Sequence, residues 1–391
     1  MPVNWKSWVR IGLEVGAVAV AVIMLVLMAQ RLEGSRGYML PNGQPMFGDY
    51  IAFWCAGDMA NHGEALVVHS DPETRACQNR VNPEIRRFAP YNSPPTFLLF
   101  DSLLARIPYG PSAMLWLALT GAIYLFAAWK LLPDKRALIF AITLPAAMYH
   151  PGSVQTGLYI AGVSGLALYF LDRRPIAAGL LVALLAIKPH LAILWPLFFA
   201  LSGRWRAFAA AAAGTLAFAA VAGFVWGWET WPNWLESLDR SAGLIINRLV
   251  GTQTYGSLFG NLLGLHWSVT AAAVTHAISA LAALGVACWV FWKSRDWRTS
   301  GIALSAATLL MSPYLFFYDS ALLALGGALL APPRNKLEVV ALFAAWGAAL
   351  SVAIGPYISL PIVPACAWLV LICALRRSGN AAPAPAQARH T

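Results

Sequence analysis

Long apolar runs alternate with short polar segments along most of the chain, and basic residues gather in every second polar segment. A helix of about 20 apolar residues crosses the hydrocarbon core of a membrane, and Lys and Arg favour the cytoplasmic end of each crossing. The pattern therefore predicts an all-α polytopic membrane protein with about twelve transmembrane helices, within a range of about ten to thirteen, and both termini in the cytoplasm. The predicted spans are residues 11–28, 112–132, 137–149, 158–171, 176–187, 191–201, 208–226, 267–292, 301–311, 320–330, 337–354 and 360–375.

Two polar segments are much longer than the others, and both fall on the outer side in this topology. Residues 30–110 form a first extracytoplasmic loop, in which turn residues separate short amphipathic stretches that we expect to be interfacial helices. Residues 227–266 form the second large extracytoplasmic loop. Residues 1–377 make one transmembrane domain, and residues 378–391, rich in Ala and Pro, are expected to be a disordered cytoplasmic tail.

Composition and charge support the membrane class. Hydrophobic residues make up 59% of the 391 residues and charged residues 11%, and the mean hydropathy is +0.62, far more apolar than an ordinary soluble domain. The formal net charge of +10 sits in short clusters between apolar runs, where it orients the spans and meets lipid headgroups. We therefore expect membrane lipids, and no nucleic acid, among the partners.

One carboxylate stands among aromatic and aliphatic residues just after the first span. This residue is Asp49, within the stretch 46–54. A side chain placed there could serve as a catalytic base at the outer membrane face. It could equally begin a helix on the membrane surface, because acidic residues favour helix N-termini.

Lys188 lies between two apolar runs on the face opposite the basic clusters, so it departs from the rule that the other short-loop cations follow. An ammonium group inside a membrane costs roughly 2.5 to 3.5 kcal/mol on insertion scales and persists where it meets a partner or a substrate. A lipid phosphate is a natural ligand for it, and Pro189 would break the helix beside it. Snorkelling to the outer headgroups, or an ion pair with Asp319, would explain the same pattern.

Asp319 lies near a late outer turn, within helix reach of Tyr318. Its carboxylate could bind sugar hydroxyls or hold Lys188 in place. A plain cap of the following span is the structural alternative.

The cysteines and histidines show no metal-ligand spacing, so no metal site is predicted. Cys55 and Cys77 share the first outer loop and could pair if that loop faces an oxidising compartment. Three other cysteines lie within apolar runs and are expected to pack there, namely Cys288, Cys366 and Cys373.

The order of several short motifs resembles the bacterial glycosyltransferase 87 family, also called DUF2029, of the GT-C superfamily of polyprenyl-phosphate-sugar-dependent enzymes. The matching pieces are Gly48-Asp49-Tyr50; Tyr91-Asn92-Ser93-Pro94-Pro95; Gln155-Thr156-Gly157; Ala186-Ile187-Lys188-Pro189; Gly203-Arg204-Trp205-Arg206; and Ser312-Pro313-Tyr314 with Tyr318-Asp319. Two departures from the family pattern are Val154, where a glycine is usual, and residues 314–319, where some members carry a histidine.

The resemblance implies a GT-C fold in a bacterial inner membrane, with an active site that faces the periplasm or exterior. It implies transfer of a hexose, most simply mannose, from a polyprenyl-phosphate-sugar to a lipid or glycan acceptor, with inversion. Asp49 would deprotonate the acceptor, and Lys188 would stabilise the departing phosphate, supported by Arg248 or an arginine of the first loop. The resemblance also points to substrate-binding roles for Gln155, Tyr50, Tyr91, Tyr318 and Asp319.

The donor is a co-substrate with its own leaving group, so no metal and no other cofactor is expected. Two other function classes fit twelve spans with both ends inside: a transporter or flippase of a lipid-linked sugar, and a non-catalytic subunit of polysaccharide assembly. Carriers usually show repeat symmetry and polar residues near the bilayer midplane. This chain gathers its polar groups at one face, which favours an enzyme.

Overall fold

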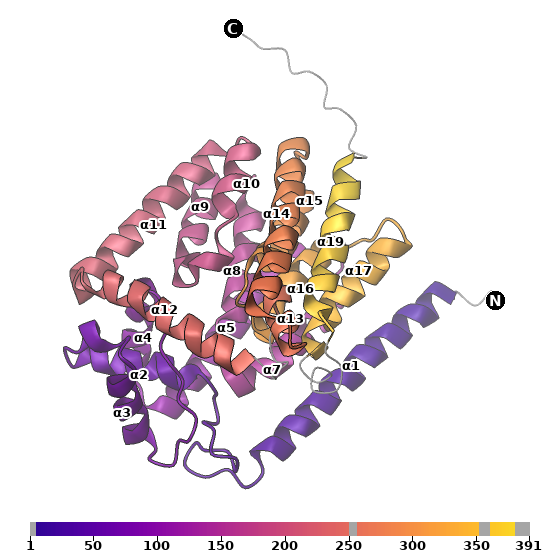
Figure 1. Ribbon diagram of the computed structural model, residues 1–391. Coiled ribbons are helices and arrows are strands. Elements are labelled where there is room, and N and C mark those ends of the chain that lie inside the picture. The colour runs from indigo at the N-terminus through magenta and orange to yellow at the C-terminus, as the bar shows by residue number, and fades with distance from the viewer. Residues whose placement is uncertain (1–4, 250–255, 352–359, 380–391) are drawn as a thin grey trace.

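Helices form nearly the whole architecture of the computed structural model (Figure 1). The structure describes residues 5–249, 256–351 and 360–379. Within these residues no strand occurs, and the extended pairing consists of isolated bridges at Met39 with Arg36 and with Pro45. The prediction of an all-α protein is confirmed.

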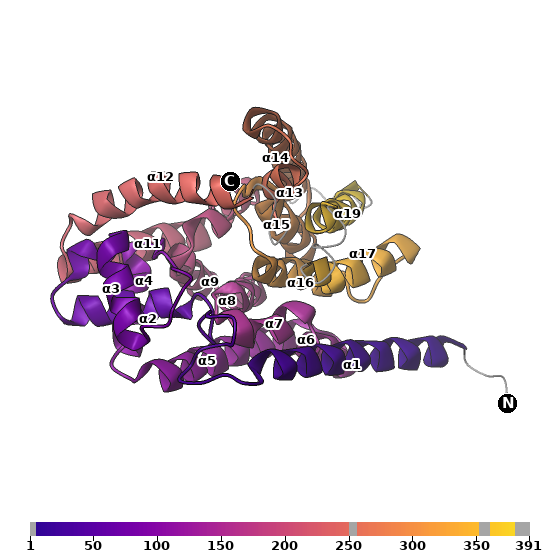
Figure 2. The ribbon, with the colours of Figure 1, turned by 60° about the horizontal axis from the view of Figure 1, so that its bottom comes forward.

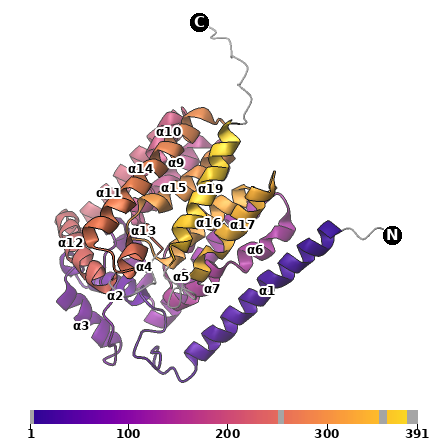
Figure 3. The same ribbon diagram turned by 45° about the vertical axis from the view of Figure 1, so that its right-hand side comes forward.

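Five helices of the described chain are long and apolar enough to cross a membrane. They are α1 (Trp5–Leu32), α5 (Tyr109–Leu131), α11 (Trp205–Trp226), α14 (Val269–Lys293) and α19 (Ile362–Gly379). α1 packs along α6 and α7 and stands at the edge of the molecule (Figure 3). α19 continues through Ser378 and Gly379, where the predicted tail should begin; the rest of that tail, from residue 380, lies outside the described residues.

The other predicted spans fall on shorter helices, several of them broken in two, so the count of about twelve stays a prediction. These elements are α6 (Leu138–Ile142), α7 (Pro145–Ser153), α8 (Gly157–Phe170), α9 (Pro175–Ala183) with η3 (Leu184–Ile187), η4 (Pro189–Leu191) with α10 (Trp195–Leu201), α15 (Trp297–Met311), η5 (Phe317–Asp319) with α16 (Ser320–Leu329), and α17 (Lys336–Gly347) with η6 (Ala348–Leu350).

The first long loop folds into a small helical layer below the bundle (Figure 1). It contains α2 (Tyr50–Asn61), η1 (Ala65–Val67), α3 (Asp71–Val81) and α4 (Pro95–Leu104). A disulfide joins Cys55 of α2 to Cys77 of α3, which answers the pairing that the sequence left open. α2 and α4 meet at backbone distance, since a Cβ atom at Gly57 would overlap the carbonyl of Asp101. Both helices bury most of their apolar residues within the protein.

The second long loop begins with α12 (Thr230–Leu249), which lies across the first loop, and continues to α13 (Leu258–Gly264) (Figure 2). Three side chains of α12 donate hydrogen bonds to backbone carbonyls of the first loop. The bonds run from Asn233 to Leu66 at 2.9 Å, from the Trp234 indole to Asn92 at 3.0 Å, and from Arg240 to His69 at 3.1 Å. The two long loops therefore form one body.

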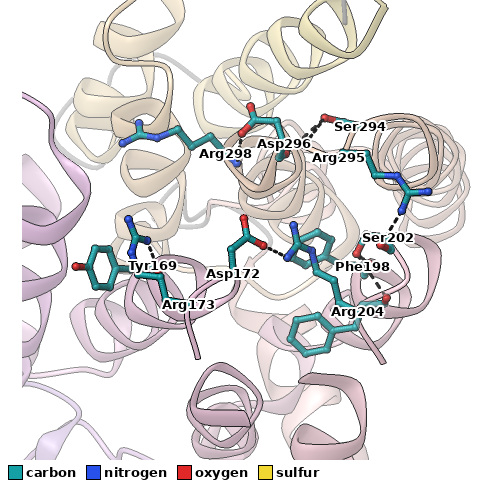
Figure 4. Close-up of polar contacts among 11 residues, drawn as sticks. Tyr169, Asp172, Arg173, Phe198, Ser202, Arg204, Ser294, Arg295, Asp296 and Arg298 are labelled. Carbon is teal, nitrogen blue, oxygen red and sulfur yellow. Dashed lines mark hydrogen bonds and ion pairs between the residues drawn. The ribbon is translucent and has the colours of Figure 1, made fainter. Parts of the chain in front are cut away.

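Basic side chains gather at the opposite end of the bundle, which we call the arginine-rich face (Figure 4). Arg298 donates to the carbonyls of Leu131 at 2.8 Å and Ala331 at 3.3 Å, and Arg295 donates to the carbonyl of Ser202 at 3.3 Å. Each of these carbonyls lies just at or after the end of a helix, where backbone acceptors lack intrahelical partners and a cation meets the negative end of the helix dipole. The cations that orient the spans therefore also cap them.

Candidate active site

Asp49 stands where the chain turns into α2, and a glycine makes that turn possible. Gly48 has a φ of +57°, and a Cβ atom there would lie 2.8 Å from the carbonyl oxygen of Gly152. Both constraints favour glycine. The Asp49 side chain is partly exposed and makes no capping bond to α2. Its Oδ2 instead accepts a hydrogen bond of 2.9 Å from Nε2 of Gln155.

Gln155 is held in place by an unusual backbone segment between α7 and α8. Its neighbour Val154 is fully buried and has a φ of +43°, in the left-handed region that disfavours β-branched residues. This is the position at which the family resemblance leads us to expect glycine. Strained backbone of this kind persists where the surroundings enforce it, and it clusters at functional sites.

The same segment touches the late outer turn. A Cβ atom at Gly157 would overlap the carbonyl oxygen of Tyr318, so the start of α8 packs directly against η5. Three stretches that are far apart in sequence thus lie against one another: the turn at Asp49, residues 152–157, and the turn at Tyr318.

Lys188 occupies a break between two half-helices. Its φ of −145° and ψ of 69° are not helical, because proline disfavours the helical conformation of the residue before it. The break leaves carbonyls of η3 free to accept other donors. The Tyr159 hydroxyl bonds the Leu184 carbonyl at 3.3 Å, and the Thr96 hydroxyl of α4 bonds the Ala186 carbonyl at 2.8 Å.

Lys188 and Asp319 form an ion pair, with 2.5 Å between Nζ and Oδ1. The Asp319 side chain is completely buried, and that of Lys188 is 15% exposed. Oδ2 of Asp319 accepts from the Phe316 amide at 3.1 Å, so both carboxylate oxygens have protein partners. The ammonium group also lies over the Tyr318 ring, 4.8 Å from its centroid. Of the roles considered for Asp319, the geometry matches the one that holds Lys188.

Two other predicted substrate-binding residues, Tyr50 and Tyr91, have their polar partners outside this group. Tyr50 is buried and its hydroxyl lies 2.6 Å from that of Ser112, and Tyr91 is buried and donates to Asp101 at 2.8 Å. Both tyrosines therefore support the first loop from inside, and their substrate-binding role stays a prediction. Arg248 lies in the last turn of α12, but its side chain falls outside the described residues.

Buried titratable groups stiffen the first loop. Burial lowers the pKa of His69 to about 4, and its Nε2 donates to the Ser93 carbonyl at 2.9 Å. Burial also raises the pKa of Asp101, although the bond from Tyr91 opposes this shift. Both shifts disfavour the charged form of the side chain, as expected in an interior that tolerates few charges.

Within the described residues, no group of three or more His, Cys, Asp or Glu side chains could hold a metal. The site offers a partly exposed carboxylate and a lysine ammonium group on neighbouring segments. A carboxylate can take a proton from a hydroxyl, and an ammonium group can stabilise a phosphate.

Sequence reasoning named the partner of only one of these two groups: it offered the ion pair of Lys188 with Asp319, which the structure contains, but not the bond from Gln155 to Asp49. It grouped Gln155 with substrate-binding residues but did not pair it with Asp49, and it gave Thr96 and Tyr159 no role. The signals were weak: Val154 in the place of a glycine, and a proline that frees carbonyls for unknown donors. Only the folded structure shows which hydroxyl groups donate hydrogen bonds to these carbonyls.

The model of the family described as glycosyltransferase family 87 matches residues 91–313. No curated protein matches the chain, and no solved structure matches it. The matched part includes Gln155 and Lys188, and leaves Asp49 and Asp319 outside it. Because the match covers more than half of its 391 residues, the chain belongs to glycosyltransferase family 87 and is a membrane glycosyltransferase.

Proposed function

We propose that this protein transfers a hexose from a polyprenyl-phosphate-sugar to a lipid or glycan acceptor at the extracytoplasmic membrane face, with inversion at the anomeric carbon. Mannose is the sugar that the family resemblance favours. The observation that carries the proposal is the packing of the Asp49 turn, residues 152–157 and the Tyr318–Asp319 turn against one another. It sets a candidate base and a candidate phosphate ligand on adjoining segments.

The reaction needs one base and one group that stabilises the negative charge on the departing phosphate. Asp49 takes the proton of the acceptor hydroxyl as its oxygen attacks the anomeric carbon. The bond from that carbon to the phosphate oxygen breaks, and its electron pair leaves with the polyprenyl phosphate. Lys188 stabilises that phosphate. The proton acceptor typically contributes about 10² to 10⁴ in rate.

Two features support the extracytoplasmic side. The Cys55–Cys77 disulfide lies in the same loop as Asp49, and disulfides form in oxidising compartments outside the cytosol. The arginine-rich face lies at the other end of the bundle (Figure 1), and Arg and Lys favour the cytoplasmic side. An active site in a bacterial inner membrane would then face the periplasm or the exterior.

The proposal is tested with purified protein in nanodiscs and radiolabelled polyprenyl-phosphate-mannose. Lipid extracted from the native membrane supplies the acceptor. We expect label to move into a new lipid or glycan product with release of polyprenyl phosphate. Asp49→Asn should lower this transfer at least about 10²-fold, because the amide cannot take the proton.

Asp58→Asn is the matched control, since Asp58 lies on α2, the helix that Asp49 precedes, and pairs with exposed His62 and Arg80. It should transfer sugar at the rate of the unmodified protein. Substantial transfer by a folded Asp49→Asn protein would remove Asp49 from the role of base. Uptake of label into sealed vesicles without any new product would favour a carrier.

A further inference from the structure

An apolar cavity of about 430 Å³ lies away from the candidate active site, toward the arginine-rich face. Ligand pockets in proteins typically measure about 300 to 1,000 Å³. Its walls come from α1, α5, α6, α8, α16 and α17, and none of its lining side chains is charged. The cavity therefore suits a hydrocarbon chain.

Alanines make the space. Those that line the cavity are Ala127, Ala128, Ala137, Ala141, Ala161, Ala324, Ala328 and Ala331. Most of them lie on α5, α6, α8 and α16, and their small side chains leave the space between these helices and α17 open. Side chains around an empty apolar space lack contact partners on one side, and a hydrocarbon chain would supply them.

Contacts between α6 and α17 close one wall of the cavity. Phe140 and Phe343 meet edge to face with 5.9 Å between ring centroids, and the Trp346 indole donates to the Phe140 carbonyl at 2.9 Å. Leu13 and Val339 also line the cavity and are 38% and 39% exposed. The cavity is therefore open to the outside of the protein beside these two residues.

Cations surround the end of the cavity that points to the arginine-rich face. The lining residues Ala137 and Pro333 adjoin Lys135, Arg136 and Arg334, all three of which are exposed. The nearby carboxylates are Glu14, which adjoins the lining residue Leu13, exposed Asp134, and Glu338, which is already bonded to Arg377 at 2.8 Å. Positive charge is therefore in excess there, which suits an anionic headgroup.

From this cavity and its basic rim, we propose that the protein binds one anionic phospholipid of the cytoplasmic leaflet. One acyl chain occupies the alanine-lined cavity, and the phosphate lies near Arg136 and Arg334. The lipid-linked donor is a different ligand, since its phosphate belongs beside Lys188 at the other end of the bundle. The proposal does not depend on which sugar is transferred.

Native mass spectrometry of the purified protein tests this. The probes are phosphatidylglycerol and phosphatidylcholine with identical acyl chains. We expect one phosphatidylglycerol to stay bound at collision energies that remove phosphatidylcholine. Ala328→Phe, which fills the cavity, should abolish this bound lipid.

Arg136→Gln with Arg334→Gln changes only exposed residues, so it tests the rim even if the filled cavity harms folding. Removing both charges should lower the preference for phosphatidylglycerol about thirtyfold, since each surface cation contributes about 1 kcal/mol toward anionic lipid. Arg206→Gln is the matched control, because Arg206 is exposed on the same face but does not adjoin the cavity.

Three results would overturn the proposal. Equal retention of the two phospholipids would show that the site does not select an anionic headgroup. If folded Ala328→Phe protein still bound the lipid, the acyl chain would not lie in the cavity. Displacement of phosphatidylglycerol by polyprenyl phosphate in the unmodified protein would assign the cavity to the donor.

Discussion

At the scale of single residues, the site depends on how Lys188 is neutralised. Its ammonium group is paired with a carboxylate that has no exposure of its own. Removing one partner of a buried pair typically costs about 3 to 5 kcal/mol, because the other charge stays buried without compensation. A single substitution therefore confuses loss of donor binding with loss of stability.

A double substitution separates the two effects. Lys188→Met should lower the free energy of unfolding by about 3 to 5 kcal/mol and also weaken donor binding. Adding Asp319→Asn should restore much of the stability, because no charge remains, while donor binding stays weak. Thermal unfolding and titration with polyprenyl-phosphate-mannose measure the two quantities. Recovery of donor binding in the double variant would exclude phosphate contact by Lys188.

The stability of the first loop depends on pH through a second residue, His69. His69 has a pKa lowered to about 4 by burial, so below pH 6.5 the unfolded loop takes up a proton that the folded loop does not. Above pH 6.5 this residue does not change the free energy of unfolding of the loop. That free energy falls as the pH drops from 6.5 toward 4. The loss should reach about 2 kcal/mol at pH 5.

Protease protection of the first loop between pH 7 and pH 4.5 measures this effect. His69→Gln keeps a donor for the Ser93 carbonyl but does not titrate, so the fall should flatten. His62→Gln should leave it unchanged, because His62 is exposed. An identical pH profile in all three proteins would show that His69 does not control the loop.

At the scale of elements, the disulfide fixes α2 against α3. It closes a separation of 22 residues, which is worth about 3 kcal/mol in the chain-entropy description. Replacing Cys55 and Cys77 with alanine should speed proteolysis of the first loop and lower sugar transfer, because Asp49 precedes α2 directly. Cys373→Ala, at a buried free cysteine, should leave proteolysis of this loop unchanged. Equal protection with and without the disulfide would show that α12 alone holds the loop.

Sequence patterns predicted these elements unevenly. The Lys188-Pro189 break was predictable, since proline acts on its own helix and on the residue before it. Tyr50 and Tyr91 were assigned to substrate because they stand in motifs that resemble the family. Their burial comes from packing of α2 on α4 under α12, which no local pattern reveals. The contact from Gln155 to Asp49 spans 106 residues and follows the close approach of Gly48 to Gly152, which no local pattern reveals either.

At the scale of the whole molecule, the two ends of α11 should lie on opposite sides of the membrane. Arg206 and Glu229 are both exposed, one at each end of this helix. In cells, a membrane-impermeant thiol reagent should label Glu229→Cys directly and Arg206→Cys only after permeabilisation. Replacing the free native cysteines with alanine removes their background. The reverse pattern would invert the proposed orientation of the active site.

The ion pair between Lys188 and Asp319 also constrains how the protein is made. The partners are 131 residues apart, so during synthesis the lysine enters the bilayer long before its carboxylate leaves the ribosome. Until then, the nascent chain must carry an unmatched charge, sheltered by lipid headgroups or by the insertion machinery. Chains that end before residue 319 should therefore remain incompletely assembled and be degraded by membrane quality-control proteases.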